Sequence, residues 1–288
     1  MLAPQLKHDD LLQNIHAARA ERDVFHLWWL GQSGFLVQWH DRHLLFDPYL
    51  SDSLTKKYAN TDLPHVRMTE LVVDPARLDF IDVVTSSHNH TDHLDAETLG
   101  PLLRVNHNLA LVIPEANRAF VAGRLQIAAR VPRGLNDGEN VEVEGFKITA
   151  VPAAHETIER DAAGRCTHLG YVAQFGPWCV YHSGDSVWDD DIIRQLQPFA
   201  IDVALLPING RKPDRRVMGN FNTKEAAQFG QRIGARVVIP CHYDMFTFNT
   251  ADPNDFAREA EAIGQPHKIL QCGERWSSSL LAAKCDYT

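Results

Sequence analysis

Four side chains that can bind metal ions lie within six residues of the segment SSHNHTDHLD: His88, His90, Asp92 and His93. In an extended segment, side chains two residues apart project to the same side, so His88 and His90 can share one ion. The chain must then turn towards the helix predicted next. That turn can bring Asp92 and His93 to a second ion beside the first. The spacing therefore favours a metal centre over a solvated, histidine-rich loop.

Three further candidates follow apolar runs elsewhere in the chain. His155 ends ITAVPAAH, Asp185 lies in YHSGDS, and His242 follows VVIPC. Each of them alone is more often a structural residue or part of a turn than a ligand. Together with the first cluster they predict one centre with only nitrogen and oxygen ligands. Such a ligand set suits zinc, manganese or iron.

The elements that must position these residues are two series of strands, each followed by strand–helix alternation. Strands are predicted at residues 25–39 (two strands), 42–50, 80–88, 110–115, 141–155 and 169–185 (two hairpins), 201–208, 236–244 and 268–271. Helices are predicted at 95–105, 116–127, 189–199, 223–234 and 253–264, with an N-terminal helical extension over 1–23 and a long loop at 52–74. This order indicates two sheets packed face to face with helices outside, in a single domain over residues 1–288.

Composition narrows the class of protein. The chain has 288 residues, of which 44% are hydrophobic, and a formal net charge of -9. No stretch approaches the roughly 20 apolar residues of a membrane span, and the start lacks the pattern of a secretory signal. Five cysteines without a C-x-x-C pair favour a reducing compartment, so we expect a cytoplasmic protein. The negative charge argues against a nucleic-acid partner.

The segment HNHTDH resembles the H-x-H-x-D-H motif of the metallo-β-lactamase superfamily, and His155, Asp185 and His242 follow in that superfamily's order. The resemblance implies a four-layer αββα sandwich with two divalent metal ions in the cleft between the sheets. It assigns His88, His90 and His155 to one ion, Asp92, His93 and His242 to the other, and Asp185 to both. Asp47 in LLFDP matches the aspartate that precedes the histidine motif in this superfamily. The resemblance implies that it orients the metal ligands without binding the metal itself.

This ligand set predicts hydrolysis. Two ions that share a water can lower its pKa from about 15.7 to near 7 and so supply a bridging hydroxide as nucleophile. Asp185 would hold the ions apart and accept a hydrogen bond from the hydroxide. Asp92 or a second water would protonate the leaving group. Asp92 and Asp185 are therefore the predicted catalytic residues.

The segments WWLGQSGFLV, FDPYLSD, YHSGDS, LLPINGR and GNFNTKEAA resemble the L-ascorbate-6-phosphate lactonase group of the superfamily. This resemblance implies a lactone or ester of a small anionic metabolite as substrate, and it is compatible with a homo-oligomer. The substrate-binding candidates are Asn209, Arg211, His168 and Tyr243. Arg211 has the two-pronged geometry that suits a phosphate or carboxylate, although a solvated loop charge is an equally good interpretation.

Two alternatives remain open at this stage. The first is a phosphodiesterase of the same fold that acts on a phospholipid or nucleotide, and an apolar groove at the mouth of the cleft would favour the lipid version. The second is a metal-stabilised binding or sensor protein without turnover. The loss of chemistry usually deletes ligands, and all seven are present here.

Overall fold

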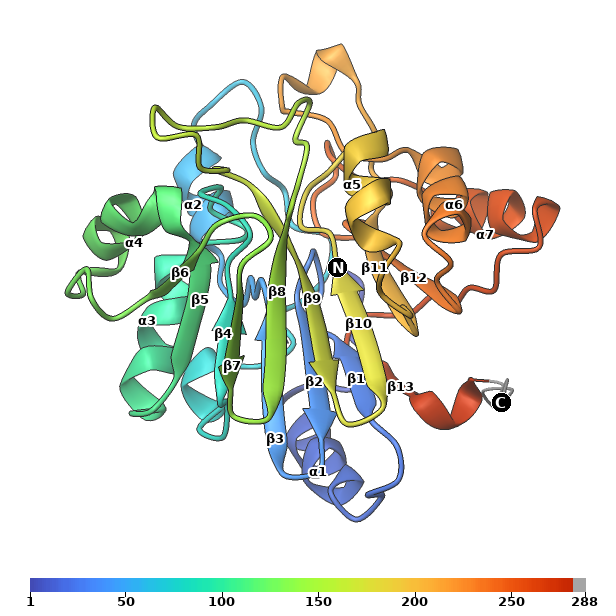
Figure 1. The fold of residues 1–288 in the computed structure, drawn as a ribbon. Helices are drawn as coiled ribbons and strands as arrows, with labels where there is room; N and C mark the ends of the chain where they lie inside the picture. Colours follow the sequence, from blue (N-terminus) through green and yellow to red (C-terminus); the bar gives the residue numbers. More distant parts are fainter. Residues whose placement is uncertain (282–288) are drawn as a thin grey trace.

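Two β-sheets pack face to face with helices on the outside, as the computed structural model of residues 1–281 shows (Figure 1). The seven-stranded sheet has the order β13 (Arg275–Ser277), β1 (His26–Trp29), β2 (Phe35–Trp39), β3 (Arg42–Phe46), β4 (Val83–Thr85), β5 (Ala110–Pro114), β6 (Arg133–Leu135). The six-stranded sheet has the order β12 (Val237–Cys241), β11 (Val203–Pro207), β10 (Trp178–His182), β9 (Leu169–Phe175), β8 (Phe146–Pro152), β7 (Asn140–Val143). Both sheets are mixed, and the predicted four-layer sandwich is confirmed.

Most helices lie at the two flanks of this pair of sheets, while α1 lies at their lower end in Figure 1. They are α1 (His8–Ala18), α2 (Ser53–Tyr58), α3 (Ala96–Val105), α4 (Arg118–Leu125), α5 (Asp190–Leu196), α6 (Thr223–Arg232) and α7 (Pro253–Ala262). The short 3-10 helices are η1 (Pro75–Arg77), η2 (Glu115–Asn117), η3 (Pro213–Arg215) and η4 (Ser278–Leu280). In Figure 1, α3 and α4 lie beside β5, while α5, α6 and α7 lie at the opposite flank near β11 and β12.

Strand direction gathers the polar ends of several strands at one edge. Strands β10, β11 and β12 are parallel, and β8 runs in the same direction as β10 because both are antiparallel to β9 between them. Strands β11 and β12 are buried along their whole length, as expected for parallel strands covered on both faces. The segments that follow β8, β10 and β12 therefore emerge together at one edge of the sheet.

One hydrophobic core joins the two sheets, and its buried members run from Leu11 in α1 to Trp276 in β13. Within the predicted helical extension over 1–23, the helix α1 spans His8–Ala18. Leu2 lies before it and forms a backbone bridge with Thr69. The helix contributes Leu11, Ile15 and Ala18 to the core.

Other boundaries also differ from the prediction. The predicted loop 52–74 contains α2, a six-residue helix with a single buried side chain, Leu54, so it has no apolar repeat to reveal it. The last strand is β13 and not residues 268–271, which make no ladder. Strand β13 has only Trp276 buried between two half-buried polar residues, a pattern too short to detect. Strand β6 was missed for the same reason.

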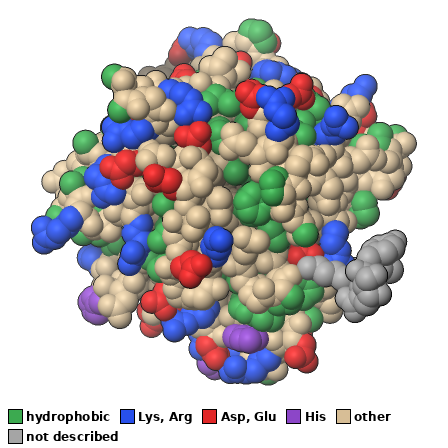
Figure 2. Space-filling view, viewed as in Figure 1, with side chains coloured by type: hydrophobic (Ala, Val, Ile, Leu, Met, Phe, Trp, Pro, Cys, Tyr) green, Lys and Arg blue, Asp and Glu red, His purple; other side chains and the backbone are tan. Residues whose placement is uncertain are grey.

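The surface carries charges of both signs. Basic and acidic side chains are interspersed over the face drawn in Figure 2. Within residues 1–281, no helix has the length and apolar character needed to cross a membrane.

Candidate metal centre

The seven predicted ligands lie together in two adjoining groups. One group contains His88, His90, His155 and Asp185, and the other contains Asp92, His93 and His242. Within each group, one ligand atom from every residue lies within 4.8 Å of the others. The grouping places the same residues together as the resemblance assigned to each ion.

Asp185 faces both groups. Its Oδ1 lies 3.3 Å from Nε2 of His93, and its Oδ2 lies 3.7 Å from Nε2 of His155 and 3.6 Å from Nε2 of His242. It follows β10 directly, after Gly184, whose φ of 59° turns the chain. A carboxylate in this position can hold two ions at once.

The first cluster is shaped by the turn after β4. The backbone N–H groups of His93 and Leu94 both donate to the carbonyl of His90, which closes the chain into a tight turn. Asp95 then caps α3 by accepting from the backbone N–H of Glu97. Because the turn reverses the chain, His88 and His90 face one group while Asp92 and His93 face the other.

The Nδ1 atoms of three histidines are anchored behind the centre. His93 donates from Nδ1 to Asp47 Oδ2 at 2.8 Å, and His155 donates to the carbonyl of Gly219 at 2.8 Å. His88 donates to Ser87 Oγ at 2.9 Å, and that hydroxyl donates in turn to Asp47. A hydrogen bond at Nδ1 fixes the tautomer and leaves the Nε2 lone pair for a metal ion.

The residues present fit divalent ions. Among residues 1–281, Nε2 of His88, Nε2 of His93 and Oδ1 of Asp185 are buried and have no hydrogen-bond partner. Buried polar atoms without partners are rare in native proteins, and all three belong to the two ligand groups. Their chemistry, imidazole nitrogen and carboxylate oxygen, is that of zinc, manganese or iron ligands.

The electrostatics of the centre also favour cations. Burial alone would raise the pKa of Asp185, yet His93 and His242 hold that pKa well below its ordinary value. Burial lowers the pKa of His88 well below 6.5, which keeps its imidazole neutral and able to ligate. Against the effect of burial, Asp185 and Asp92 raise the pKa of His93 well above 6.5 and that of His242 to about 9, so a divalent ion that binds there would displace protons from these two imidazoles.

Comparison with known proteins identifies the family. The family model described as "Beta-lactamase superfamily domain" matches residues 42–243, which include every predicted ligand. A UPF0173 metal-dependent hydrolase of Methanopyrus kandleri is 32% identical over 253 residues, covering 86% of this chain and 97% of the relative. The chain belongs to the beta-lactamase superfamily and, within it, to the UPF0173 metal-dependent hydrolases. This membership makes it a metal-dependent hydrolase and favours turnover over a role in binding alone.

Solved structures show the same fold. A possible metal-dependent hydrolase from Veillonella parvula superposes with a TM-score of 0.69 at 16% identity, covering 87% of this chain and 98% of that one. The isothiocyanate hydrolase from Delia radicum gut bacteria superposes with a TM-score of 0.68 at 18% identity, over 87% of this chain and 98% of that one. At these identities the likeness concerns the fold.

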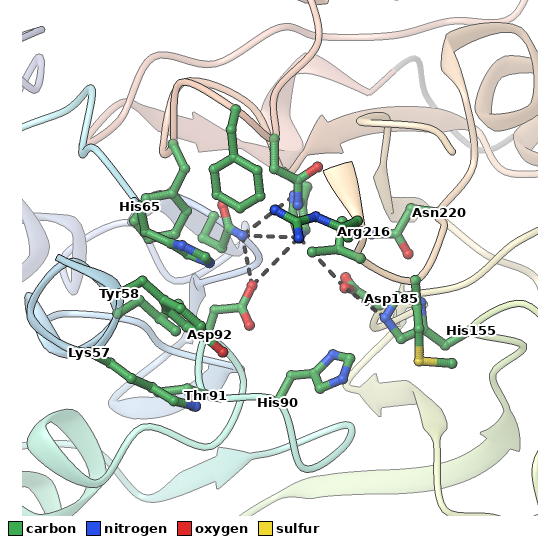
Figure 3. Close-up of a pocket in the computed structure, with 18 of the residues that line it drawn as sticks. Lys57, Tyr58, His65, His90, Thr91, Asp92, His155, Asp185, Arg216 and Asn220 are labelled. Carbon is green, nitrogen blue, oxygen red and sulfur yellow. Dashed lines mark hydrogen bonds and ion pairs between the residues drawn. The ribbon is translucent and has the colours of Figure 1, made fainter. Parts of the chain in front are cut away.

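The metal centre of this hydrolase opens into a cavity of about 330 Å³ (Figure 3). His90, Asp92, His155, Asp185 and His242 form its floor. The walls and mouth include side chains of α2, His65, Arg124 of α4, and residues 216–218, 220, 246, 248 and 249. Apart from the two aspartates of the centre, the lining contains no acidic residue within the part of the chain that the structure describes.

Aromatic rings form one wall of the cavity. His65 stacks on Tyr58 with ring centroids 4.1 Å apart and lies 4.3 Å from the ring of Phe248 and 5.3 Å from that of Phe246. Burial lowers the pKa of His65, so its ring is neutral at pH 7 and contributes an apolar face. Figure 3 shows His65 and Tyr58 on the side of the cavity away from His155 and Asn220.

The predicted substrate-binding residues are only partly at the cavity. Asn209 lies behind it, where it accepts a hydrogen bond from Asn220 at 3.0 Å and donates to Asn249 at 2.9 Å. Both of these partners line the cavity. His168 packs beside the first group, 4.9 Å from the ring of His88, and is almost fully buried. Asn209 and His168 thus support the site from behind.

Arg211 and Tyr243 lie elsewhere than predicted. Arg211 forms an ion pair with Glu225 of α6 at 2.5 Å and does not line the cavity. Tyr243 is a core residue: its ring packs 4.3 Å from that of Trp29, and its hydroxyl donates to the carbonyl of Leu270. The position next to His242 suggested a cleft residue, but β12 ends at Cys241 and the chain turns at His242, whose φ is 64°, so Tyr243 enters the core instead.

Sequence reasoning missed several residues of the site. Arg216, and not Arg211, is the arginine of that loop at the cavity, because Arg215 donates to the carbonyls of Asn209 and Thr250 and fixes the loop. Ser87 was overlooked although it lies between the strand and His88. Gln32 lies in the segment WWLGQSGFLV, and nothing in that segment predicts the positive φ of 50° that this residue adopts.

Proposed function

We propose that this hydrolase cleaves an ester- or lactone-type bond in a small anionic metabolite with the help of two divalent ions, zinc or manganese before iron. The observation that carries the proposal is the pair of ligand groups joined by Asp185 on the floor of a cavity whose mouth is lined by cations. Two such ions, when bound, would activate water and polarise the substrate oxygen.

The protein's own residues prepare this chemistry. Asp185 would hold the two ions at a fixed separation. Asp92 is the more exposed of the two aspartates, with 16% of its side chain accessible against 5% for Asp185, and it faces the cavity. It is therefore the group placed to exchange a proton with the leaving-group oxygen. The anchored Nδ1 atoms keep His88, His93 and His155 in the orientation that the ions need.

The mouth supports an anionic substrate. Lys57, Arg124 and Arg216 line it, and no acidic side chain outside the centre lies among the described lining residues. The bond from Arg216 to Asp62 is an exposed ion pair at 2.6 Å, which is weak in water and can exchange for a substrate anion. Asn220 offers a buried Oδ1 with no partner in residues 1–281, which can accept a hydrogen bond from a substrate hydroxyl.

A second candidate function is phosphodiester hydrolysis of a lipid-like substrate. The aromatic wall of Tyr58, His65, Phe246 and Phe248 favours it, because such a wall would hold an apolar chain or ring while the cations hold a phosphate. The cavity of about 330 Å³ has room for a small molecule or for the reacting end of a larger one.

The experiment that tests these functions pairs metal content with a matched substrate panel. The panel would contain one lactone with and without a phosphate group, one aryl ester with and without a carboxylate, and one phosphodiester. We expect about two equivalents of metal, and faster turnover of the anionic member of each ester or lactone pair. His90→Ala should lose activity, whereas His107→Ala, a change to an exposed histidine outside the site, should not. Turnover of the phosphodiester alone would favour the second candidate, and full activity without metal would exclude both.

A further inference from the structure

Gln32 lies in the turn between β1 and β2, directly against the second ligand group. Its backbone carbonyl accepts hydrogen bonds from Nε1 of Trp29 and from the backbone N–H of His242, both at 3.0 Å. The residue has a φ of 50° and is 1% exposed. These contacts fix the backbone of Gln32 beside His242, and the side chain is buried there.

The amide nitrogen of Gln32 touches two metal-ligand candidates at once. Nε2 donates to Oδ2 of Asp92 at 2.8 Å and lies 2.9 Å from Nε2 of His242. That histidine nitrogen is the one that faces the centre, 3.6 Å from both Asp92 and Asp185. The amide oxygen Oε1 is buried and has no hydrogen-bond partner within residues 1–281.

This arrangement conflicts with an ion in the second group. An ion there needs the lone pairs of His242 Nε2 and of the Asp92 carboxylate, and an amide N–H pointing at the same lone pairs would compete with it. The amide nitrogen itself has no lone pair to offer. Rotation of the amide by about half a turn exchanges nitrogen and oxygen, which are nearly isosteric. The oxygen then takes the place of the nitrogen beside Asp92 Oδ2 and His242 Nε2, the atoms that would hold the ion.

We propose that Gln32 is a ligand of the second metal ion, through its carboxamide oxygen. The inference rests on the two-ion centre of the proposed function and adds a residue outside the seven. An added neutral oxygen raises the coordination number of the ion held by Asp92, His93, His242 and Asp185. Five or more ligands that include several oxygens suit manganese or iron better than tetrahedral zinc, so Gln32 would bias the second position towards those metals.

A simpler role has to be distinguished from this one. Gln32 could act only as a hydrogen-bond donor that positions Asp92, as its contact of 2.8 Å would allow. The two roles use opposite atoms of the same amide. Gln32→Glu keeps an oxygen and removes the N–H donor, whereas Gln32→Met keeps the length of the side chain and removes both.

The experiment is a titration of the metal-free full chain with Mn²⁺, followed by calorimetry and by the electron paramagnetic resonance of bound Mn²⁺. We expect two sites in the unaltered chain. Gln32→Met should weaken one site by roughly 10- to 100-fold and leave the other unchanged. Gln32→Glu should bind the second ion as tightly as glutamine does or more tightly. Gln38→Met is the matched control, because it alters a buried glutamine whose amide donates, among the described residues 1–281, only to the carbonyl of His40.

Two outcomes would overturn the inference. In one, Gln32→Met binds both ions normally. In the other, Gln32→Glu loses the second ion as severely as Gln32→Met, which shows that the N–H donor is what matters. Thermal unfolding of each metal-free variant checks that the fold survives. Metal binding is measured without substrate, so a chain that binds two ions through Gln32 but cleaves no ester would contradict only the proposed function.

Discussion

The floor and the mouth of the cavity are built in different ways. The floor and the remaining metal-ligand candidates follow strands β4, β8, β10 and β12, and three of these histidines, His93, His88 and His155, are anchored at Nδ1 by Asp47, Ser87 and a backbone carbonyl respectively. The mouth consists of side chains from loops and short helices, and the side chain of one of its arginines, Arg216, is held within residues 1–281 only by an exposed ion pair with Asp62. The sheets thus determine the chemistry, while the loops can change the substrate without disturbing it.

The largest loss of turnover should come from a change to Asp185, which faces both ligand groups. Asp185→Asn keeps the shape of the side chain but removes the charge that faces both ligand groups. We expect turnover to fall by roughly 10³-fold or more and at least one metal equivalent to be lost. Activity assays and elemental analysis of the purified variant would check this. Normal metal content with normal turnover would show that Asp185 does not bridge.

A smaller effect should follow from a change behind the ligands. Asp47 is fully buried and accepts hydrogen bonds from His93, Ser87 and Thr85. Asp47→Asn replaces one acceptor oxygen by a donor and removes the charge, so His93 loses its orientation. Metal affinity or activity should fall by roughly 10- to 100-fold, measured by competition with a chelating dye. Asp82→Asn, which removes a carboxylate bound to His43 and Arg42 far from the centre, serves as control. An equal loss in both variants would contradict a specific role for Asp47.

The floor could be predicted from the sequence because each ligand stands at a position that local rules describe. His88, His155 and His242 come at or just after the end of an apolar run, and parallel strands bring such ends to one edge. Asp92 and His93 share a six-residue segment with His88. The resemblance of HNHTDH to a known motif supplied the division into two groups, which the spacing alone left open.

The mouth could not be predicted in the same way, because its residues meet through contacts between distant loops. Arg216 reaches the cavity only because Arg215 fastens its loop to Thr250, and nothing in RKPDRR tells these arginines apart. His65 becomes part of an aromatic wall by stacking on Tyr58 of α2, a helix without an apolar repeat. Tyr243 was predicted at the cavity because it adjoins His242. The φ of 64° at His242 turns the backbone, a conformation that the sequence does not reveal, and the Tyr243 ring lies in the core.

Arg216 lines the cavity and Arg211 does not, so changing each of them tests whether the cations at the mouth bind an anionic substrate. Arg216→Gln should raise KM for an anionic substrate about 10-fold and leave kcat nearly unchanged, because the charge assists binding and not the reaction. The effect should shrink at high salt. Arg211→Gln, a change to the arginine paired with Glu225 away from the cavity, should leave KM within about 2-fold. Steady-state kinetics on the charged and uncharged members of one substrate pair would measure both, and a larger effect at Arg211 would reverse the assignment.

The smallest effect should appear at Tyr243, which adjoins a ligand in sequence but belongs to the core. Tyr243→Phe removes the hydroxyl that donates to Leu270 and keeps the ring that packs on Trp29. The hydroxyl also accepts from the backbone N–H of Leu270, so two buried hydrogen bonds are lost. The free energy of unfolding should decrease by about 2 kcal/mol, and denaturant titration would measure it. Turnover and metal content should stay unchanged, since the hydroxyl points away from the centre. A loss of turnover at normal stability would show that Tyr243 contacts the substrate and belongs to the cavity floor beside β12, and not to the core.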